Sequence, residues 1–191
     1  TGSIVRRTGV AADQKLSANF SVGIEASRRK LTVPGLVGDF QDSNWDESSV
    51  QAYTSFLLGK DVSITLEHYF EKFSRPDDPF SIDRFSKLRT HRTPLRIRYF
   101  PNSRLHAKLS LSFVRQTGRF LDIDSNELVD GHDSFFVTDF GVTYSFANRQ
   151  GSVGIEARNL FDEQFKYQES DPTTPLLPRR RLVFVRASLL F

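Results

Sequence analysis

Side chains that could carry out chemistry are present in this 191-residue chain, but their spacing favours no reaction. The chain has no Cys, which excludes thiol nucleophiles, disulfides and cysteine-bound metals. The four histidines, His68, His91, His106 and His132, have no metal-ligand spacing, and no nucleophile motif is present. His106 with Ser110, or His68 with a serine on a neighbouring strand, leaves a hydrolase as a minor alternative. The sequence therefore predicts a protein that is not an enzyme and holds no cofactor.

An acidic stretch in the middle of the chain is the second candidate for chemistry. Asp122, Asp124 and Asn126 place oxygen ligands at every second residue, as calcium loops do. Glu127 stands where an EF-hand has its turn glycine, and no helical pattern flanks the segment. We interpret the stretch as a solvated acidic loop, with a weak calcium site as the alternative.

Charged residues at every second position form the third candidate, because alternation along a strand places them all on one face. The polar residues expected on the inner face of a barrel are Glu67, Arg96, Arg98, Lys108, Glu156 and Arg186. Such residues either contact a small anionic ligand or, more commonly, pair with one another and with water. The net charge is only +3, with basic and acidic residues well mixed, which gives no indication of nucleic-acid binding.

Strands must position these side chains, since apolar and polar residues alternate along much of the chain. In residues 105–113, for example, Leu105, Leu109 and Phe113 oppose Lys108. The same pattern predicts further strands over residues 17–27, 49–58, 62–70, 88–100, 136–146, 152–158 and 181–191, with residues 3–10 as a candidate ninth. Together these segments predict eight or nine strands and an all-β fold.

The composition is compatible with a membrane protein that crosses with strands. No run approaches the roughly 18 consecutive apolar residues of a spanning helix, and 38% of the residues are hydrophobic. A barrel strand is apolar on one face only, so a low mean hydropathy is expected. Aromatic residues make up 13% of the chain, including 18 Phe, which suits strands and the aromatic girdles of membrane barrels.

Short and long connections alternate between the predicted strands. Tight turns are predicted at residues 59–61, 101–103 and 147–151, with a short link at 11–14. Long polar loops are predicted at 33–48, 74–87, 117–133 and 161–179. Outer-membrane barrels have short periplasmic turns and long extracellular loops. The pattern predicts an antiparallel up-and-down transmembrane β-barrel, with residues 1–191 as the whole barrel domain or its C-terminal part.

The strand count leaves the size of the barrel open. An odd strand at the start indicates part of a larger barrel, whereas eight strands could close by themselves. A soluble β-sandwich or lipocalin-like barrel would show the same alternation and is kept as an alternative.

The last strand has one wholly apolar face that ends on an aromatic residue. This face consists of Val183, Val185, Ala187, Leu189 and Phe191. It resembles the C-terminal signal by which the barrel-assembly machinery recognises outer-membrane proteins. We therefore expect that machinery and the lipid of the outer membrane as partners.

The segment before the last strand carries a family resemblance. Asn159-Leu160-Phe161-Asp162, after an alternating strand and before Phe165, resembles the penultimate strand of TonB-dependent outer-membrane receptors. The resemblance covers the last part of the chain, and upstream only the strand rhythm agrees.

The resemblance implies a function as well as a fold. It implies the barrel portion of a receptor in the outer membrane of a Gram-negative bacterium, without its plug domain. Such a receptor recognises an unidentified small ligand with extracellular loops and takes it up through TonB, which contacts the missing plug. A small structural outer-membrane barrel, or a soluble binding module without transport activity, is the alternative.

Overall fold

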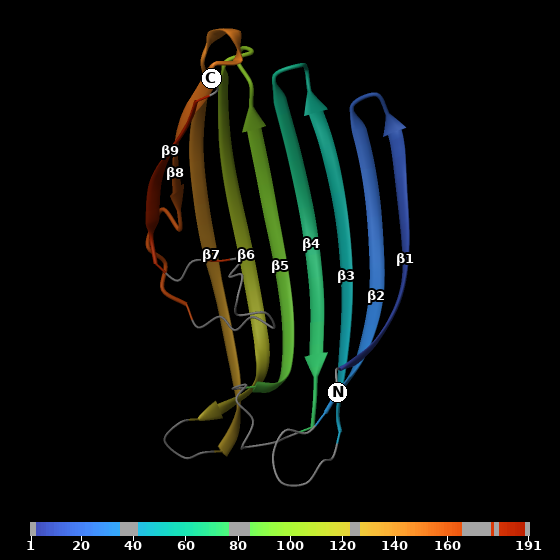
Figure 1. The fold of residues 1–191 in the computed structure, drawn as a ribbon. Coiled ribbons are helices and arrows are strands. Elements are labelled where there is room, and N and C mark those ends of the chain that lie inside the picture. The colour runs from blue at the N-terminus through green and yellow to red at the C-terminus, as the bar shows by residue number, and fades with distance from the viewer. Residues whose placement is uncertain are drawn as a thin grey trace.

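The computed structural model describes residues 3–34, 42–76, 85–122, 127–165, 177 and 180–189. These residues form one antiparallel sheet of nine strands, in which each strand pairs with its neighbours in sequence (Figure 1). The strands are β1 (Ile4–Ser17), β2 (Phe20–Val33), β3 (Ser43–Leu58), β4 (Val62–Ser74), β5 (Phe85–Tyr99), β6 (Leu105–Asp122), β7 (Glu127–Ser145), β8 (Gly151–Arg158) and β9 (Leu182–Leu189). The predicted all-β, up-and-down antiparallel architecture is confirmed.

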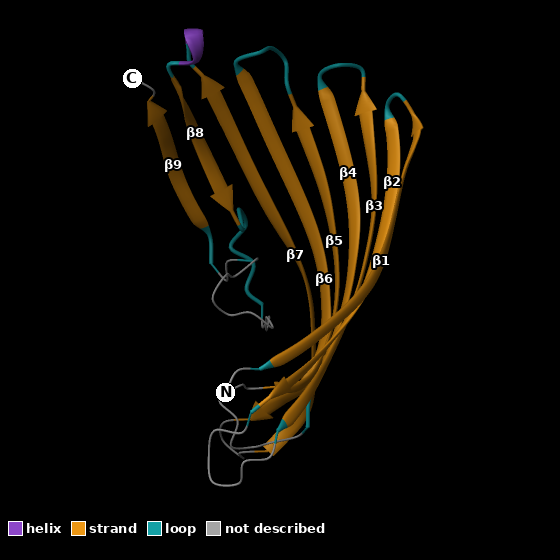
Figure 2. Cartoon of the chain, turned by 45° about the vertical axis from the view of Figure 1, so that its right-hand side comes forward, coloured by secondary structure: helices purple, strands orange, loops and turns teal. Residues whose placement is uncertain are grey.

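The sheet is curved, and its two edges remain open. Figure 2 shows β8 and β9 standing apart from β1 to β4, with the sheet bending between them. β1 and β9 do not pair with each other in the described part of the chain. Because nine strands alternate in direction, β1 and β9 run the same way, toward the end with the short turns (Figure 1). Direct closure would therefore require one parallel strand pair.

Several strands are longer than the sequence predicted. β3 begins at Ser43, β6 ends at Asp122 and β7 begins at Glu127. The predicted loop at 33–48 is therefore wrong over residues 43–48, and the predicted loop at 117–133 is wrong over residues 117–122 and 127–133. Apolar and polar residues still alternate along these strand extensions, but there most of the large apolar residues lie on the other face of the sheet. A cluster of Phe73, Phe85 and Leu88, with Trp45 and Phe120 packed against it, holds the extended ends of β3 to β6 together.

The first strand also differs from the prediction. β1 pairs with β2 from Ile4 to Ser17, so the predicted link at residues 11–14 is strand and the turn lies at 18–19. Many residues of this strand are small or polar, so apolar and polar residues do not alternate clearly along it. Its backbone pairing with β2, for example between Ala12 and Ile24, needs no large side chain. Every residue of β1 is exposed, as befits an edge strand.

The main core lies on one face of the sheet, called here the inner face. Val114, Phe135 and Val137 of β6 and β7 are buried there together with Leu177. The ring of Phe165 stacks on Phe135, with 4.1 Å between the ring centroids. The connection from β8 to β9 thus covers the inner face at these points. Among the described residues there is no helix with the length and hydrophobicity needed to cross a bilayer.

Candidate functional site: an apolar outer band and a polar inner face

The two faces of the sheet differ sharply in character. Along β6, Ser112, Val114 and Gln116 are buried on the inner face. Phe113, between them, points to the other face and is 46% exposed. The strand register carries this alternation across the sheet, since residues paired on adjacent strands share a face. The face opposite the core is called here the outer face.

A largely apolar surface, called here the outer band, covers the outer face from β2 to β9, with Thr54, His68, Thr93 and Thr138 as polar positions within it. Its exposed members include Ile24, Phe56, Leu58, Leu66, Tyr99, Phe113, Phe136, Phe140, Ile155, Val183 and Val185. On β6 the outer band runs from Leu105 to Phe113 and on β7 from Phe136 to Tyr144. A soluble protein seldom exposes so extended an apolar surface, so the outer band requires an apolar partner.

Aromatic residues gather at both edges of the outer band. At the edge near the short turns, Phe20 and Phe56 meet edge to face, with ring centroids 6.3 Å apart. Tyr99 and Tyr144 lie at the same edge on β5 and β7. At the far edge, β4, β6 and β7 contribute Phe70, Phe113 and Phe136. The outer band is thus bordered by two aromatic rows.

The inner face carries a hydrogen-bonded network over β3, β4 and β5. Arg96 forms an ion pair of 2.7 Å with Glu67. The hydroxyl of Tyr69 donates a hydrogen bond to Glu67 Oε2 at 3.1 Å and accepts one from Gln51 Nε2 at 3.1 Å. The Arg92 guanidinium lies 4.1 Å from the centroid of the Tyr69 ring. Glu67, Tyr69, Gln51 and Arg96 are therefore linked by hydrogen bonds and an ion pair, whereas the buried Nε of Arg92 has no hydrogen-bond partner among the described residues.

A second network links β6, β8 and β9 on the same face. Glu156 Oε2 lies 2.5 Å from Lys108 Nζ, and Glu156 Oε1 accepts a hydrogen bond of 2.9 Å from Arg158 Nε. The guanidinium carbons of Arg158 and Arg186 lie 5.5 and 5.9 Å from the Phe184 ring centroid. Phe184, an apolar residue on a polar face, thus serves as a platform for two arginines.

The six polar residues expected inside all lie on the inner face: Glu67, Arg96, Arg98, Lys108, Glu156 and Arg186. Glu67 with Arg96 and Lys108 with Glu156 form ion pairs, whereas Arg98 is exposed near the short turns and pairs with no described carboxylate.

Two further polar residues of the inner face, Tyr69 and Gln116, were not predicted from the sequence. Gln116 is buried and donates a 2.8 Å hydrogen bond to Thr90; its only signal was its inward position in the alternation.

The family-motif residues form a turn that ends β8. Asn159 is completely buried and has a left-handed φ of 48°. Its backbone N–H donates to Asp139 Oδ1 at 2.9 Å. Its amide donates to the carbonyl of Glu163 and accepts from the Glu163 N–H, both at 2.9 Å. A short polar side chain in the left-handed region is the arrangement that asparagine tolerates well.

The other motif residues fix the chain on either side of this turn. The Leu160 N–H donates to the Thr138 carbonyl at 2.7 Å, which keeps the chain beside β7. Asp162 Oδ1 accepts a 2.7 Å hydrogen bond from the N–H of Arg181, just before β9. Phe161 is 74% exposed. The motif thus ties together both ends of the connection between β8 and β9.

The remaining sequence candidates are placed as follows. Val183, Val185, Ala187 and Leu189 lie on the outer face of β9, while Phe191 lies outside the described residues. Of the calcium candidates, Asp124 and Asn126 also lie outside the described residues, and Asp122 is the last residue of β6.

The histidines are spread over both faces. His68 and His91 lie on the outer face, with 3.5 Å between His68 Nε2 and His91 Nδ1, and His68 Nδ1 lies 2.8 Å from Thr93 Oγ1. His106 stacks on Phe100 on the inner side, near the short turns. His132 lies on the outer face of β7. The described residues contain no group of three or more acidic or histidine side chains that could hold a metal ion.

Comparison of the chain with protein-family models, with curated proteins and with solved structures found no match. What the chain does must be inferred from its two faces.

Proposed function

We propose that this sheet is part of the wall of an outer-membrane β-barrel, with the outer band in contact with lipid. The full-length protein would be a receptor that binds a small ligand and takes it up. The observation that carries the proposal is the outer band itself, an exposed apolar surface on a sheet whose other face is polar and hydrogen-bonded. Lipid on one face and water on the other is the environment of a barrel wall.

The height of the outer band supports a bilayer as its partner. Leu105 to Phe113 on β6 and Phe136 to Tyr144 on β7 each cover a stretch of nine residues. At about 3.3 Å per residue and a tilt of about 40°, such a stretch covers roughly 20 Å, close to the apolar height of outer-membrane barrels. Aromatic rows at both edges match the girdles that these barrels place at the two membrane interfaces.

The open edges support a larger barrel. β1 and β9 run in the same direction, and natural outer-membrane barrels close through antiparallel pairs. An odd number of further strands between β1 and β9 would satisfy both edges. This arrangement favours part of a larger receptor barrel over a self-contained small barrel.

The assignment to TonB-dependent uptake rests on the resemblance of Asn159-Leu160-Phe161-Asp162 and of the closing strand. In this proposal the barrel-assembly machinery recognises the outer face of β9, and TonB acts through a plug that lies outside this chain. The long connections recognise the ligand. The connection after Asp162, which covers part of the inner face through Phe165 and Leu177, narrows the interior.

Folding in lipid tests this proposal. The chain is refolded in neutral phosphatidylcholine vesicles, in detergent and in buffer alone, and is followed by β-sheet circular dichroism and by gel mobility before and after boiling. We expect β-rich circular dichroism only in vesicles or detergent, where the outer band is covered; a heat-modifiable band would show in addition that the chain closes by itself into a small barrel. A folded, soluble monomer in buffer alone would contradict the proposal and favour a soluble binding module.

A further inference from the structure

The outer face changes character where the outer band ends. Beyond Phe70, Phe113 and Phe136 the strands continue, but their outward side chains are mostly polar or charged. The basic residues in these rows include Arg28, Lys30, Lys72, Lys87, Arg89 and Arg115, called here the basic belt. All six are exposed. On β4 and β6 a basic residue, Lys72 or Arg115, is the next outward residue after the last aromatic residue of the outer band.

The strand register brings members of the basic belt together at the edge of the outer band. Lys72 of β4 pairs directly with Arg89 of β5. Arg115 of β6 pairs with His91, which in turn pairs with Phe70 of the far aromatic row. Arg115 is therefore level with the last apolar residues, and Lys72 and Arg89 lie one outward-facing position beyond it.

Carboxylates neutralise only part of this charge. Arg28 Nε donates to Asp46 Oδ1 at 3.0 Å, and the hydrogen bonds from Arg28 hold the pKa of the Asp46 carboxyl below its ordinary value. Asp130 lies 3.9 Å from Arg119. Lys72, Arg89 and Arg115 form no ion pair with any residue that the structure describes. Lys72 also helps to lower the pKa of the Asp46 carboxyl, but that carboxyl is already hydrogen-bonded to Arg28, so the cluster keeps a positive charge that favours an anionic ligand.

The basic belt is found at one edge of the outer band only. At the short-turn edge the outward residues are apolar or aromatic, including Phe20, Leu58, Val62, Tyr99 and Tyr144. The asymmetry would distinguish the two sides of a bilayer. A patch that served only solubility would have no reason to follow one edge of an apolar surface.

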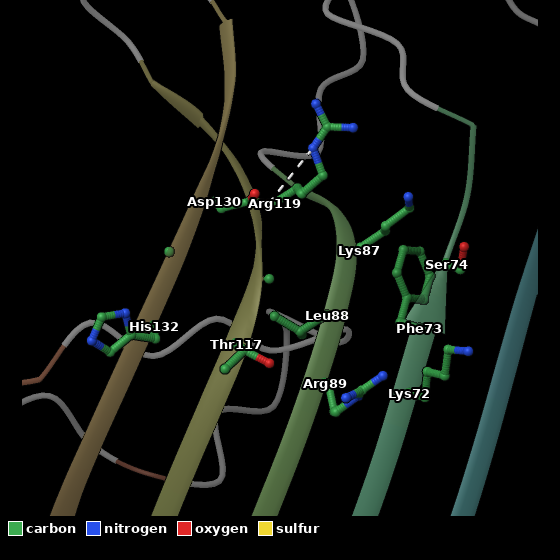
Figure 3. A pocket seen from close by; sticks show the side chains of 12 residues that line it. Lys72, Phe73, Ser74, Lys87, Leu88, Arg89, Thr117, Arg119, Asp130 and His132 are labelled. Carbon is green, nitrogen blue, oxygen red and sulfur yellow. Dashed lines mark ion pairs between the residues drawn. The ribbon is translucent and has the colours of Figure 1, made fainter.

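A hollow in the surface lies within this region (Figure 3). It has a volume of about 840 Å³, and its lining includes Lys72, Lys87 and Arg89 of the basic belt. Thr117 and His132 add a hydroxyl and an imidazole to the same lining. These groups could donate hydrogen bonds to phosphate oxygens beside the cationic side chains.

We propose that the basic belt binds the phosphate groups of anionic lipids in the membrane leaflet on the side of the long connections. This inference rests on the proposed function, since lipid phosphates reach the basic belt only if the outer band lies in the hydrocarbon layer. Headgroup phosphates lie just outside that layer, at the height where Arg115, Lys72 and Arg89 follow the last aromatic residues. The guanidinium groups bind phosphate oxygens bidentately, and the lysine contributes a point charge.

The test compares two variants with the same change in net charge. K72Q/R89Q/R115Q removes the central cations of the basic belt. K15Q/K60Q/R104Q removes three cations near the short turns, of which Lys15 lies on the inner face and Lys60 and Arg104 lie in the turns themselves. All proteins are first refolded in neutral phosphatidylcholine vesicles and checked for the same β-rich circular dichroism. Native mass spectrometry of the refolded proteins in neutral detergent then measures binding of phosphatidic acid and of phosphatidylcholine.

We expect the unchanged chain and K15Q/K60Q/R104Q to prefer phosphatidic acid. K72Q/R89Q/R115Q should bind it at least about tenfold more weakly, since each basic residue near an anionic surface contributes about fivefold. Equal binding by both folded variants would overturn the basic belt as a lipid site and leave the membrane proposal intact. If K72Q/R89Q/R115Q does not fold, K72Q/R89Q takes its place, with K60Q/R104Q as its control.

Two further outcomes would overturn the inference in distinguishable ways. If inorganic phosphate at the same concentration displaces phosphatidic acid, the basic belt is a site for free phosphate rather than for lipid. If the unchanged chain folds as a soluble monomer in buffer alone, the membrane proposal itself fails, and the lipid site fails with it.

Discussion

The carboxylate of Asp139 accepts a 2.9 Å hydrogen bond from the backbone N–H of Asn159, twenty positions later in the chain. A side chain on β7 therefore helps to end β8 and to set the direction of the connection that follows. The Asn159 amide completes the turn through two hydrogen bonds to the backbone of Glu163. The motif that suggested a receptor family thus has a clear structural role in this chain.

Replacement of Asn159 should destabilise the protein strongly. N159A removes two hydrogen bonds from a fully buried site and places a Cβ-bearing residue without a polar side chain at a φ of 48°. We expect a loss of about 3 kcal/mol in the free energy of unfolding. N159G keeps the backbone tolerance and should lose about 1 kcal/mol less than N159A. Urea unfolding from detergent measures both, and equal losses would show that the left-handed backbone contributes nothing.

The Lys108–Glu156 pair should contribute modestly to stability, because it is only partly buried. The side chains are 43% and 16% exposed, and Arg158 shares the carboxylate. A double-mutant cycle with K108Q and E156Q should give a coupling energy of about 1 kcal/mol. The more exposed Arg7–Glu25 pair, at 62% and 52%, is the control and should give close to zero. Equal coupling in the two cycles would show that burial does not strengthen the inner network.

A charge in the middle of the outer band should be costly, whereas the same charge one residue further along should be tolerated. Leu109 lies on the outer face and Ser110 on the inner face of β6. L109K should destabilise the folded protein in vesicles by about 2 to 4 kcal/mol, the range for a lipid-facing charge near the bilayer centre. S110K should cost much less, because Asp139 lies opposite it on β7. Similar costs at both positions would argue against lipid on the outer face.

The two sheet edges should not meet in the folded protein. The chain has no cysteine, so introduced pairs can be tested without background. Val10 on β1 and Val185 on β9 both lie on the outer face. V10C combined with V183C, V185C or A187C should form no intramolecular disulfide on oxidation. V153C/A187C, directly paired across β8 and β9, is the positive control. A bond between β1 and β9 would show that nine strands close on themselves.

The sequence predicted the parts of the strands that carry the outer band well and their extensions beyond the outer band poorly. Between Leu105 and Phe113 the apolar residues keep to one face, so a simple alternation reveals the strand. Beyond that segment Trp45 and Phe120 are apolar on the inner face while the outer face becomes charged. A search for one constant apolar face therefore ends too early. β1 was obscured for a different reason, because its central residues are small and only its pairing with β2 defines it.

The candidate polar residues were predictable as a group but not as partners. Alternation alone places Glu67 and Arg96 on one face, whereas their 2.7 Å contact depends on the register between β4 and β5. β4 ends at Ser74 and β5 begins at Phe85, so no tight turn between them sets that register. The Asn159–Asp139 contact likewise joins two strands through a register that no local pattern encodes.

A label scan along β6 in lipid vesicles would test the orientation of the sheet most directly. Single cysteines at residues 107 to 113 are each labelled with a spin label, and collisions with oxygen in the lipid and with a water-soluble nickel complex are compared. We predict that labels at Ala107, Leu109, Leu111 and Phe113 meet oxygen preferentially, whereas labels at the inner-face positions Lys108 and Ser110 meet the nickel complex and the buried position Ser112 is reached by neither. Uniform access of the nickel complex to all seven positions would show that the outer band does not face lipid.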